Sequence, residues 1–146
     1  MKRAMLAGIV VAMMAAGCAT TPKEPPVPDW RDNDPMIAQL SATARKAFDT
    51  GDIPTSVVLY RRALDRARAM DNPPEIGRNA YNLAAGLIAL EEWDEITGLL
   101  VEAERETIRA GGDAGPILLL AAEARMMQRE RTAAEVVSDR LEALPV

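Results

Sequence analysis

From Pro35 onward, apolar side chains recur every three or four residues, which is the spacing that places them on one face of an α-helix. Six segments show this pattern, so the sequence predicts an all-α domain of six helices over residues 35–146. Helix by helix, the predicted buried faces are Ile37, Leu40, Ala44, Ala47 and Phe48; Ile53, Val57, Tyr60, Leu64 and Ala67; Ile76, Ala80, Leu83, Ala84 and Leu87; Trp93, Ile96, Leu100, Ala103, Thr107 and Ala110; Leu118, Ala121, Ala122, Arg125 and Met126; and Ala134, Val137, Leu141 and Leu144.

Caps and helix breakers divide the pattern into short units. Asp34, Asp52 and Asn72 each stand where a predicted helix begins, and a proline follows within the first two helical positions. Gly51 and Gly111 stand where predicted helices end. We therefore expect successive helices to fold back on one another as hairpins with short turns.

The last two predicted helices form a third hairpin. Pro116 begins the fifth helix, and residues 132–135, Thr-Ala-Ala-Glu, have the spacing of a capping box, which predicts the start of a sixth. The run 117–120 is apolar on every side of the fifth helix, and Met126 and Met127 follow it. Because such a helix needs cover on every side, we expect a partner or a second copy of the chain to dock on this hairpin.

The first residues of the chain have the layout of an export signal. Lys2 and Arg3 precede 14 apolar or small residues, from Ala4 to Gly17. This run is shorter than the roughly 20 residues that a membrane-spanning helix needs. Residues 1–17 are therefore predicted to be a leader that is removed.

Cys18, the only cysteine of the chain, follows this run directly. The context Ala15-Ala16-Gly17-Cys18 resembles the lipobox of bacterial lipoproteins, with alanine in place of the common leucine at its first position. The resemblance implies cleavage before Cys18, a lipid on its thiol and acylation of the new amino group. Ala19, where an aspartate would retain such a protein at the inner membrane, implies an outer-membrane anchor facing the periplasm. The alternative is an ordinary export signal cut nearby, which leaves a free thiol.

Residues 18–34 are predicted to be the lipidated cysteine and a tether. This segment contains Pro22, Pro25, Pro26 and Pro28 and shows no apolar periodicity. A polyproline-like chain extends by about 3.1 Å per residue, so the residues after Cys18 can hold a domain up to roughly 50 Å from its anchor.

Two of the predicted hairpins carry the residues of a known repeat. Gly51-Asp52 opens a helix in which Tyr60 and Ala63 take the aromatic and small positions of a tetratricopeptide repeat, which this segment resembles. In the next unit, residues 82–84, Asn-Leu-Ala, resemble the Asn-Leu-Gly of the first repeat helix, and Trp93 takes the aromatic position of the turn.

This resemblance implies about three units and six helices, stacked as a short right-handed solenoid. Ile53, Trp93 and Arg131 occupy equivalent positions in the three units. Their separations in the sequence exceed the repeat length of the family, which is about 34 residues. The helices or turns are therefore expected to be extended. An unrelated six-helix bundle with the same hairpins is the alternative.

Composition excludes several classes of function. The chain has 17 Lys and Arg, 22 Asp and Glu, a net charge of −5 and no histidine, and loss of Lys2 and Arg3 with the leader makes the charge more negative. Nucleic acid needs clustered basic side chains and is excluded as a partner; the arginines between positions 61 and 68 are interpreted as a solvated helix face. Without histidine or a free thiol, the chain is predicted to have no metal site, no cofactor and no catalytic activity.

Acidic runs at 91–95 and 102–106 supply the carboxylate pairs that a wall-modifying hydrolase would use. We interpret these runs as solvated helix faces, because charge runs of this kind lie on exposed surfaces.

The tetratricopeptide resemblance implies a partner groove on the first helix of each hairpin. The candidate groove residues are Arg45, Phe48, Arg78, Tyr81, Asn82, Leu119, Glu123, Met126 and Met127. We expect another envelope protein or a peptide segment to bind there, so the chain is predicted to be a membrane-anchored adaptor in envelope assembly or secretion. For the apolar members, packing between helices is the alternative interpretation. The alternative function is that of a periplasmic ligand-binding accessory lipoprotein of a transporter, which would show a deep, enclosed pocket.

Overall fold

Five helices joined by short turns make up the part of the chain that the computed structural model describes, residues 34–142. They are α1 (Pro35–Asp49), α2 (Ile53–Ala69), α3 (Pro73–Ala89), α4 (Ile96–Arg109) and α5 (Gly115–Glu142), and these residues contain no strand. The all-α class is therefore confirmed. The predicted leader, Cys18, the tether up to residue 33 and Leu144 lie outside the described residues.

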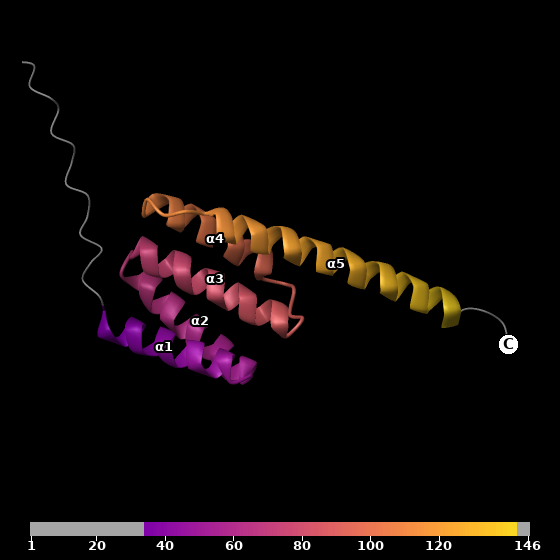
Figure 1. Ribbon diagram of the computed structural model, residues 1–146, viewed down its shortest axis with the longest axis horizontal. Coiled ribbons are helices and arrows are strands. Elements are labelled where there is room, and N and C mark those ends of the chain that lie inside the picture. Colours follow the sequence, from indigo (N-terminus) through magenta and orange to yellow (C-terminus); the bar gives the residue numbers. More distant parts are fainter. Residues whose placement is uncertain (1–33, 143–146) are drawn as a thin grey trace, which may run out of the picture.

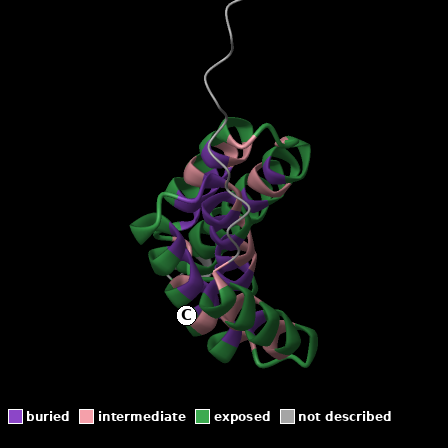
Figure 2. Cartoon of the chain, turned by 90° about the vertical axis from the view of Figure 1, so that its left-hand side faces the viewer, coloured by how far each residue is buried: buried purple, intermediate pink, exposed green. Residues whose placement is uncertain are grey.

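Each helix packs against the next one in the chain, and α3 also touches both α1 and α5. Figure 1 shows that α1, α3 and α5 run in one direction, and that α2 and α4 return in the other. Buried residues form a continuous band between the stacked helices in Figure 2. The hairpins that the sequence predicts for the first four helices are confirmed.

The four turns between the helices end the preceding helix in the same way. In each turn, one residue adopts a positive φ, and these residues, Gly51, Asp71, Glu91 and Gly111, recur at equal intervals along the sequence. The N–H of the following residue donates a hydrogen bond to a carbonyl five residues earlier, which is the Schellman arrangement. The pairs are Asp52 to Ala47 at 2.9 Å, Asn72 to Ala67 at 3.1 Å, Glu92 to Leu87 at 2.9 Å and Gly112 to Thr107 at 2.8 Å.

Side-chain caps fix the starts of the first three helices, as the sequence predicts. Asp34 Oδ1 accepts hydrogen bonds from the N–H groups of Met36 and Ile37, at 2.8 and 3.1 Å. Asp52 and Asn72 each accept one from the third residue of their helix, at 3.2 and 3.3 Å. These bonds pair backbone donors that a helix start leaves free.

The predicted buried faces of the first four helices form most of the core. In α3 all five predicted positions are buried, and in α2 only Ile53 is half-buried. The positions at the edge of the stack are half-buried, and they are Leu40, Ala47, Phe48, Trp93, Thr107 and Ala110.

The prediction of a sixth helix is wrong, because α5 continues without interruption to Glu142. Thr132 does not cap a new helix; its hydroxyl donates to the carbonyl of Gln128 within α5 at 3.0 Å. Arg131, where a turn was expected, forms an ion pair with Glu135 one helical turn later, at 3.2 Å. Residues 128–135 contain no Gly, Pro, Asn or Asp, so nothing in this segment favours a helix end. The third hairpin is therefore absent from the described part of the chain.

The predicted buried face of the fifth helix is also wrong. Ile117 and Ala124 are the buried residues of α5, whereas the predicted Leu118 and Met126 are 52% and 63% exposed. Every residue from Arg125 to Arg140 is exposed. The reason is visible in Figure 1, where α5 projects well beyond the ends of the other helices and only its first half has neighbours to pack on.

The close approach of α3 and α4 depends on a glycine, which gives a test of the packing. A Cβ on Gly77 would lie 2.5 Å from Thr107 Oγ1 and 3.2 Å from Thr107 N, whereas a Cβ on Gly98 would meet nothing within 4 Å. We expect Gly77→Ala to lower the free energy of unfolding by about 1–3 kcal/mol through overpacking. The matched control Gly98→Ala should raise it by up to about 1 kcal/mol, because alanine favours the helix. Urea unfolding followed by circular dichroism measures both, and equal effects would contradict this packing.

Candidate functional site

The candidate groove residues on the first unit lie on α1. Arg45 is exposed and interacts with the buried Tyr60 hydroxyl of α2, while Phe48 is half-buried. Burial raises the pKa of the Tyr60 hydroxyl, and the Arg45 guanidinium partly opposes this rise. Arg45 therefore stands at the α1–α2 boundary with part of its hydrogen-bonding capacity already used.

The candidates of the second unit lie on α3. Arg78 is exposed and donates to Glu75 at 2.5 Å, and Asn82 is half-buried. Tyr81 is half-buried and packs against the hydrophobic core, so its ring is partly structural. A hydrogen bond of 2.7 Å from Ser41 Oγ to Asn79 Oδ1 connects α1 to α3 beneath this surface.

The candidates of the third unit lie on α5, and all four are exposed. Leu119 is 61% exposed, Met126 63% and Met127 45%, and Glu123 is also exposed. Leu119 lies two residues after the buried Ile117, and Met126 lies two residues after the buried Ala124. Two residues correspond to about half a helical turn, so both side chains lie on the side of α5 opposite its buried residues. They point away from α4, and the structure places them on the outer side of α5.

The structure thus brings the α1 and α3 candidates onto neighbouring helices, but it does not gather all nine into one groove. Five of them, Arg45, Phe48, Arg78, Tyr81 and Asn82, belong to adjoining helices that run in the same direction. Leu119 and Met126 belong to a separate outer face.

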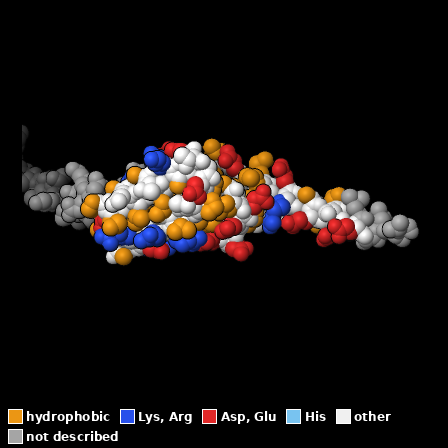
Figure 3. All heavy atoms as spheres, turned by 90° about the horizontal axis from the view of Figure 1, so that it is seen from below, with side chains coloured by type: hydrophobic (Ala, Val, Ile, Leu, Met, Phe, Trp, Pro, Cys, Tyr) orange, Lys and Arg blue, Asp and Glu red, His pale blue; other side chains and the backbone are white. Residues whose placement is uncertain are grey.

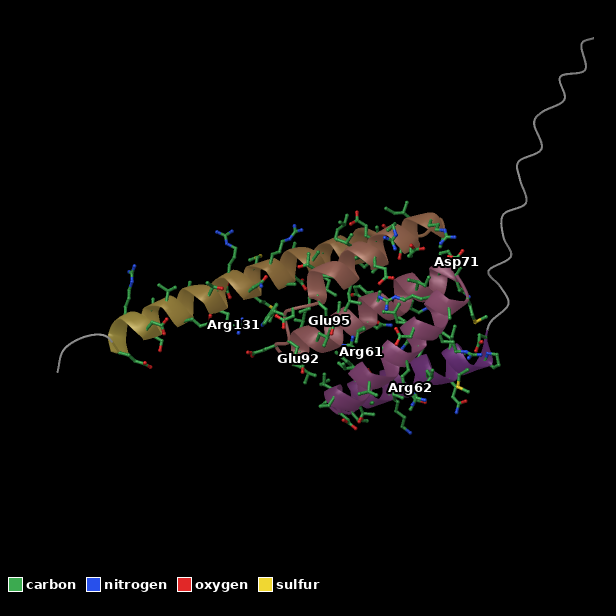
Figure 4. The ribbon with its side chains drawn as sticks, turned by 180° about the vertical axis from the view of Figure 1, so that it is seen from behind. Arg61, Arg62, Asp71, Glu92, Glu95 and Arg131 are labelled. Carbon is green, nitrogen blue, oxygen red and sulfur yellow. The ribbon has the colours of Figure 1, made fainter. Side chains whose placement is uncertain are left out.

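A set of ion pairs that joins α2 to α4 and its N-cap, Glu95, was not predicted from the sequence. Arg61 binds both carboxylate oxygens of Glu95, at 2.7 and 2.6 Å, and Arg68 binds both of Glu102, at 2.9 and 2.5 Å. No Cα atom of α2 lies within 8 Å of one of α4, so these long side chains bridge the two helices. Arg61 and Arg68 keep 41% and 43% of their side chains exposed, as a solvated face requires, but both are also held in ion pairs, as Figure 4 illustrates with Arg61 and Glu95.

Two further arginines of these helices also reach carboxylates. Arg66 of α2 binds Asp34, the N-cap of α1, at 2.9 Å, and Arg109 of α4 binds both oxygens of Asp71, at 2.7 and 2.8 Å. The equal seven-residue spacings of Arg61 and Arg68 and of Glu95 and Glu102 are the signal that predicts such a ladder.

Arginines hold several of the acidic groups in their ionised form. Hydrogen bonds from Arg61 to Glu95 and from Arg105 to Glu106 lower the pKa of each carboxyl. Arg109 contributes a second hydrogen bond to Glu106 at 3.2 Å and lowers the pKa of Asp71. Glu95 and Glu106 belong to the predicted acidic runs, yet they are fixed in ion pairs.

The turn between α3 and α4 gathers three further acidic side chains. Glu91, Glu92 and Asp94 border a surface hollow of about 310 Å³ together with Arg131 of α5. Figure 4 shows Glu92 and Arg131 on the same side of the molecule. Within residues 34–142, no group of three His, Cys, Asp or Glu side chains is arranged to hold a metal ion.

A small cleft separates α4 from the first half of α5. It encloses about 100 Å³ and is lined mainly by apolar groups, among them Trp93, Leu100, Ile117 and Ala121. The indole N–H of Trp93 is buried and has no hydrogen-bond partner in the described part of the protein. None of the nine candidate groove residues lines this cleft.

No helix among residues 34–142 is both long enough and apolar enough to cross a membrane. The chain matches no protein family, curated protein or solved structure with which it was compared.

The buried carboxylate of Glu106 gives a pH-dependent test of the ion pairs. Because its pKa is lowered in the folded protein, it stabilises the fold above about pH 4.3, the ordinary value for Glu, and this contribution disappears as the pH falls through the lowered pKa. We expect Glu106→Gln to be less stable than wild type at pH 7 and the difference to vanish towards pH 3. Urea unfolding between pH 3 and 7 measures this. The control Glu92→Gln, at an exposed position, should track the wild type throughout, and a constant deficit for Glu106→Gln would contradict the electrostatic account.

Proposed function

We propose that this chain is a lipid-anchored envelope protein whose helical repeats act as an adaptor for another envelope protein. The observation that carries the proposal is Cys18, which stands directly after an export-type leader in a lipobox-like context and ahead of a domain made of stacked helices. Lipid chains supply the membrane affinity, at about 0.8 kcal/mol for each buried methylene.

The arrangement of the helices supports the tetratricopeptide-like part of the proposal. Each helix packs on the next, and α1, α3 and α5 form one edge of the stack, as the first helices of successive repeats do. The turns at Gly51, Asp71, Glu91 and Gly111 recur at equal intervals, as the turns of a repeat protein do. Two of these intervals make one unit, which is longer than the family's repeat of about 34 residues. On this view the chain is a short solenoid with extended units.

The binding surface that we propose crosses α1 and α3. On these two helices Arg45 and Arg78 are exposed, and Phe48, Tyr81 and Asn82 are half-buried. This combination suits a peptide or helix with apolar side chains and at least one carboxylate.

The cavities favour this adaptor over the transporter-associated ligand binder. A pocket for a small molecule typically has about 300–1,000 Å³ and mostly apolar walls. The α4–α5 cleft holds about 100 Å³, and the hollow of about 310 Å³ at the α3–α4 turn is lined by charged side chains and Trp93. Two further hollows, of about 540 and 360 Å³, are bordered by residues of α5 alone and do not enclose a ligand.

The ion pairs argue against a hydrolase. A glycosidase needs one carboxyl with a raised pKa to act as general acid. Hydrogen bonds from arginines lower the pKa of Glu95 and Glu106, which leaves them ionised and occupied.

The anchor can be tested by replacing the proposed lipid-bearing residue. We expect Cys18→Ser to abolish incorporation of labelled palmitate and to prevent processing at Cys18. Fractionation of cells that express the full chain, with labelled palmitate and mass spectrometry of the N-terminus, measures this. A mature wild-type chain that carries no lipid would contradict the anchor.

The binding surface can be tested by reversing its charges. The double variant Arg45→Glu, Arg78→Glu should reduce capture of the partner from solubilised envelopes by about tenfold, since a hydrogen-bonded charge pair is lost and replaced by repulsion. The matched control Lys46→Glu, Arg62→Glu carries the same net charge and alters residues of α1 and α2 outside this surface. Equal capture by the two variants, or capture of nothing by the wild type, would contradict the proposal.

A further inference from the structure

The second half of α5 is a helix without neighbours. The helix has 28 residues and is therefore about 42 Å long, whereas α1 to α4 have 14–17 residues each. Figure 3 shows its end projecting beyond the other helices, with hydrophobic, acidic and basic side chains on its surface. A helical segment of about 14 residues is only marginally stable in water on its own, so this half gains most from a partner.

An apolar stripe runs along the outer side of α5 for most of its length. Its members are Leu119, Met126, Ala133 and Val137, all exposed, and they lie on the side opposite the buried Ile117 and Ala124. The stripe continues from the half of the helix that packs on α4 into the half that projects.

The stripe contains a hollow of the kind that helix pairs use. Met126, Arg129, Glu130 and Ala133 surround it, and they stand at positions i, i+3, i+4 and i+7 of the helix. Four residues with this spacing form the hole that receives a side chain from a facing helix in a coiled coil. The small side chain of Ala133 leaves the space open.

Charges of opposite sign flank the two sides of the stripe. With 100° between successive residues, Arg129 lies on one side, and Glu123 and Glu130 lie on the other. Arg125 lies on the same side as Arg129 but farther from the stripe, at the edge of the α4–α5 cleft. The structure shows no ion pair for any of these four residues among residues 34–142. Their charges are available to a partner.

We propose that the occupant of this face is the α5 helix of a second copy of the chain, paired in parallel and in register. A two-fold axis parallel to the helices brings the basic flank of each copy against the acidic flank of the other. Arg129 then faces Glu130 of the second copy, which gives two intermolecular pairs, and Arg125 adds positive charge on the same flank. The aliphatic stems of the arginines cover the hollow beside Ala133.

The charge pattern also selects the direction of pairing. In an antiparallel two-fold pair, each flank meets the same flank of the other helix, whatever the register. Arginine would then face arginine, and glutamate would face glutamate. A parallel pair also places both chain entries, at α1, at the same end of the dimer, which suits two copies anchored in one membrane; this last point rests on the proposed function.

Cysteine cross-linking of the purified full chain, with a mild oxidant added, tests the direction. In an antiparallel pair, only one position of α5 can lie opposite the same position of the second copy. In a parallel pair in register, every position of the stripe lies opposite its equivalent. We expect disulfide-linked dimers from Met126→Cys and equally from Ala133→Cys. The chain with Cys18 alone gives the background, and Arg62→Cys on α2 gives a control for random collision.

Charge reversal tests the contacts, with Ala133→Cys as the reporter. An acidic variant, Arg125→Glu with Arg129→Glu, and a basic variant, Glu123→Arg with Glu130→Arg, should each form about tenfold less dimer, because like charges then face each other. Co-expression of the two should restore mixed dimers to the original yield. Lys46→Glu with Arg62→Glu matches the acidic variant in net charge and should have no effect.

Three results would overturn the proposal. They are dimer yields from both stripe positions no higher than from Arg62→Cys, self-linkage at only one stripe position, and failure of the mixed variants to pair. Circular dichroism shows whether each variant keeps its helices. None of these readouts depends on lipid or on capture of a partner. The dimer can therefore be disproved while the proposed function stands, and the proposed function can be disproved while the dimer stands.

Discussion

One backbone hydrogen bond, repeated at each turn, sets the architecture of residues 34–111. It spans a residue in the left-handed conformation, at Gly51, Asp71, Glu91 and Gly111, and it reverses the chain within a few residues. Glycine adopts this conformation freely, whereas Asp71 and Glu91 do so at an energetic cost. Core packing on both sides of these two turns offsets that cost, since α3, which they delimit, is the most buried helix of the stack.

The contrast between these turns and α5 explains how far the sequence predicts the fold. Residues 34–111 contain a cap or a glycine at most boundaries, and the positions of their helices and buried faces follow from local pattern. One more step of the same length falls at Arg131, where the Thr-x-x-Glu motif resembles a helix start. The motif states only that a helix is favoured after Thr132. The motif does not require that a preceding helix ends before Thr132. Because helix-forming residues stand on both sides of Thr132, α5 continues through it.

The candidate site shows a different limit. Periodicity identifies which residues avoid the core, so the exposure of Arg45, Arg78 and Leu119 follows from spacing. It does not identify which exposed residues face each other across helices. The pairs of α2 with α4 link residues 34 positions apart, and their formation depends on the angle at which the helices stack. Because the pattern does not show which exposed residues lie together, the sequence predicted a single groove. The structure instead has one set of candidates on α1 and α3 and another on the outer side of α5.

The two edges of the helical stack are held by different forces. Along one edge, α1, α3 and α5 touch directly, whereas along the other α2 and α4 are spanned by arginine side chains of which about two-fifths is exposed. Salt shortens the range of such interactions, from about 10 Å at 0.1 M to about 3 Å at 1 M, and leaves apolar contacts in place. Higher ionic strength therefore weakens the link between α2 and α4 and leaves the direct contacts of α3 with α1 and α5 in place.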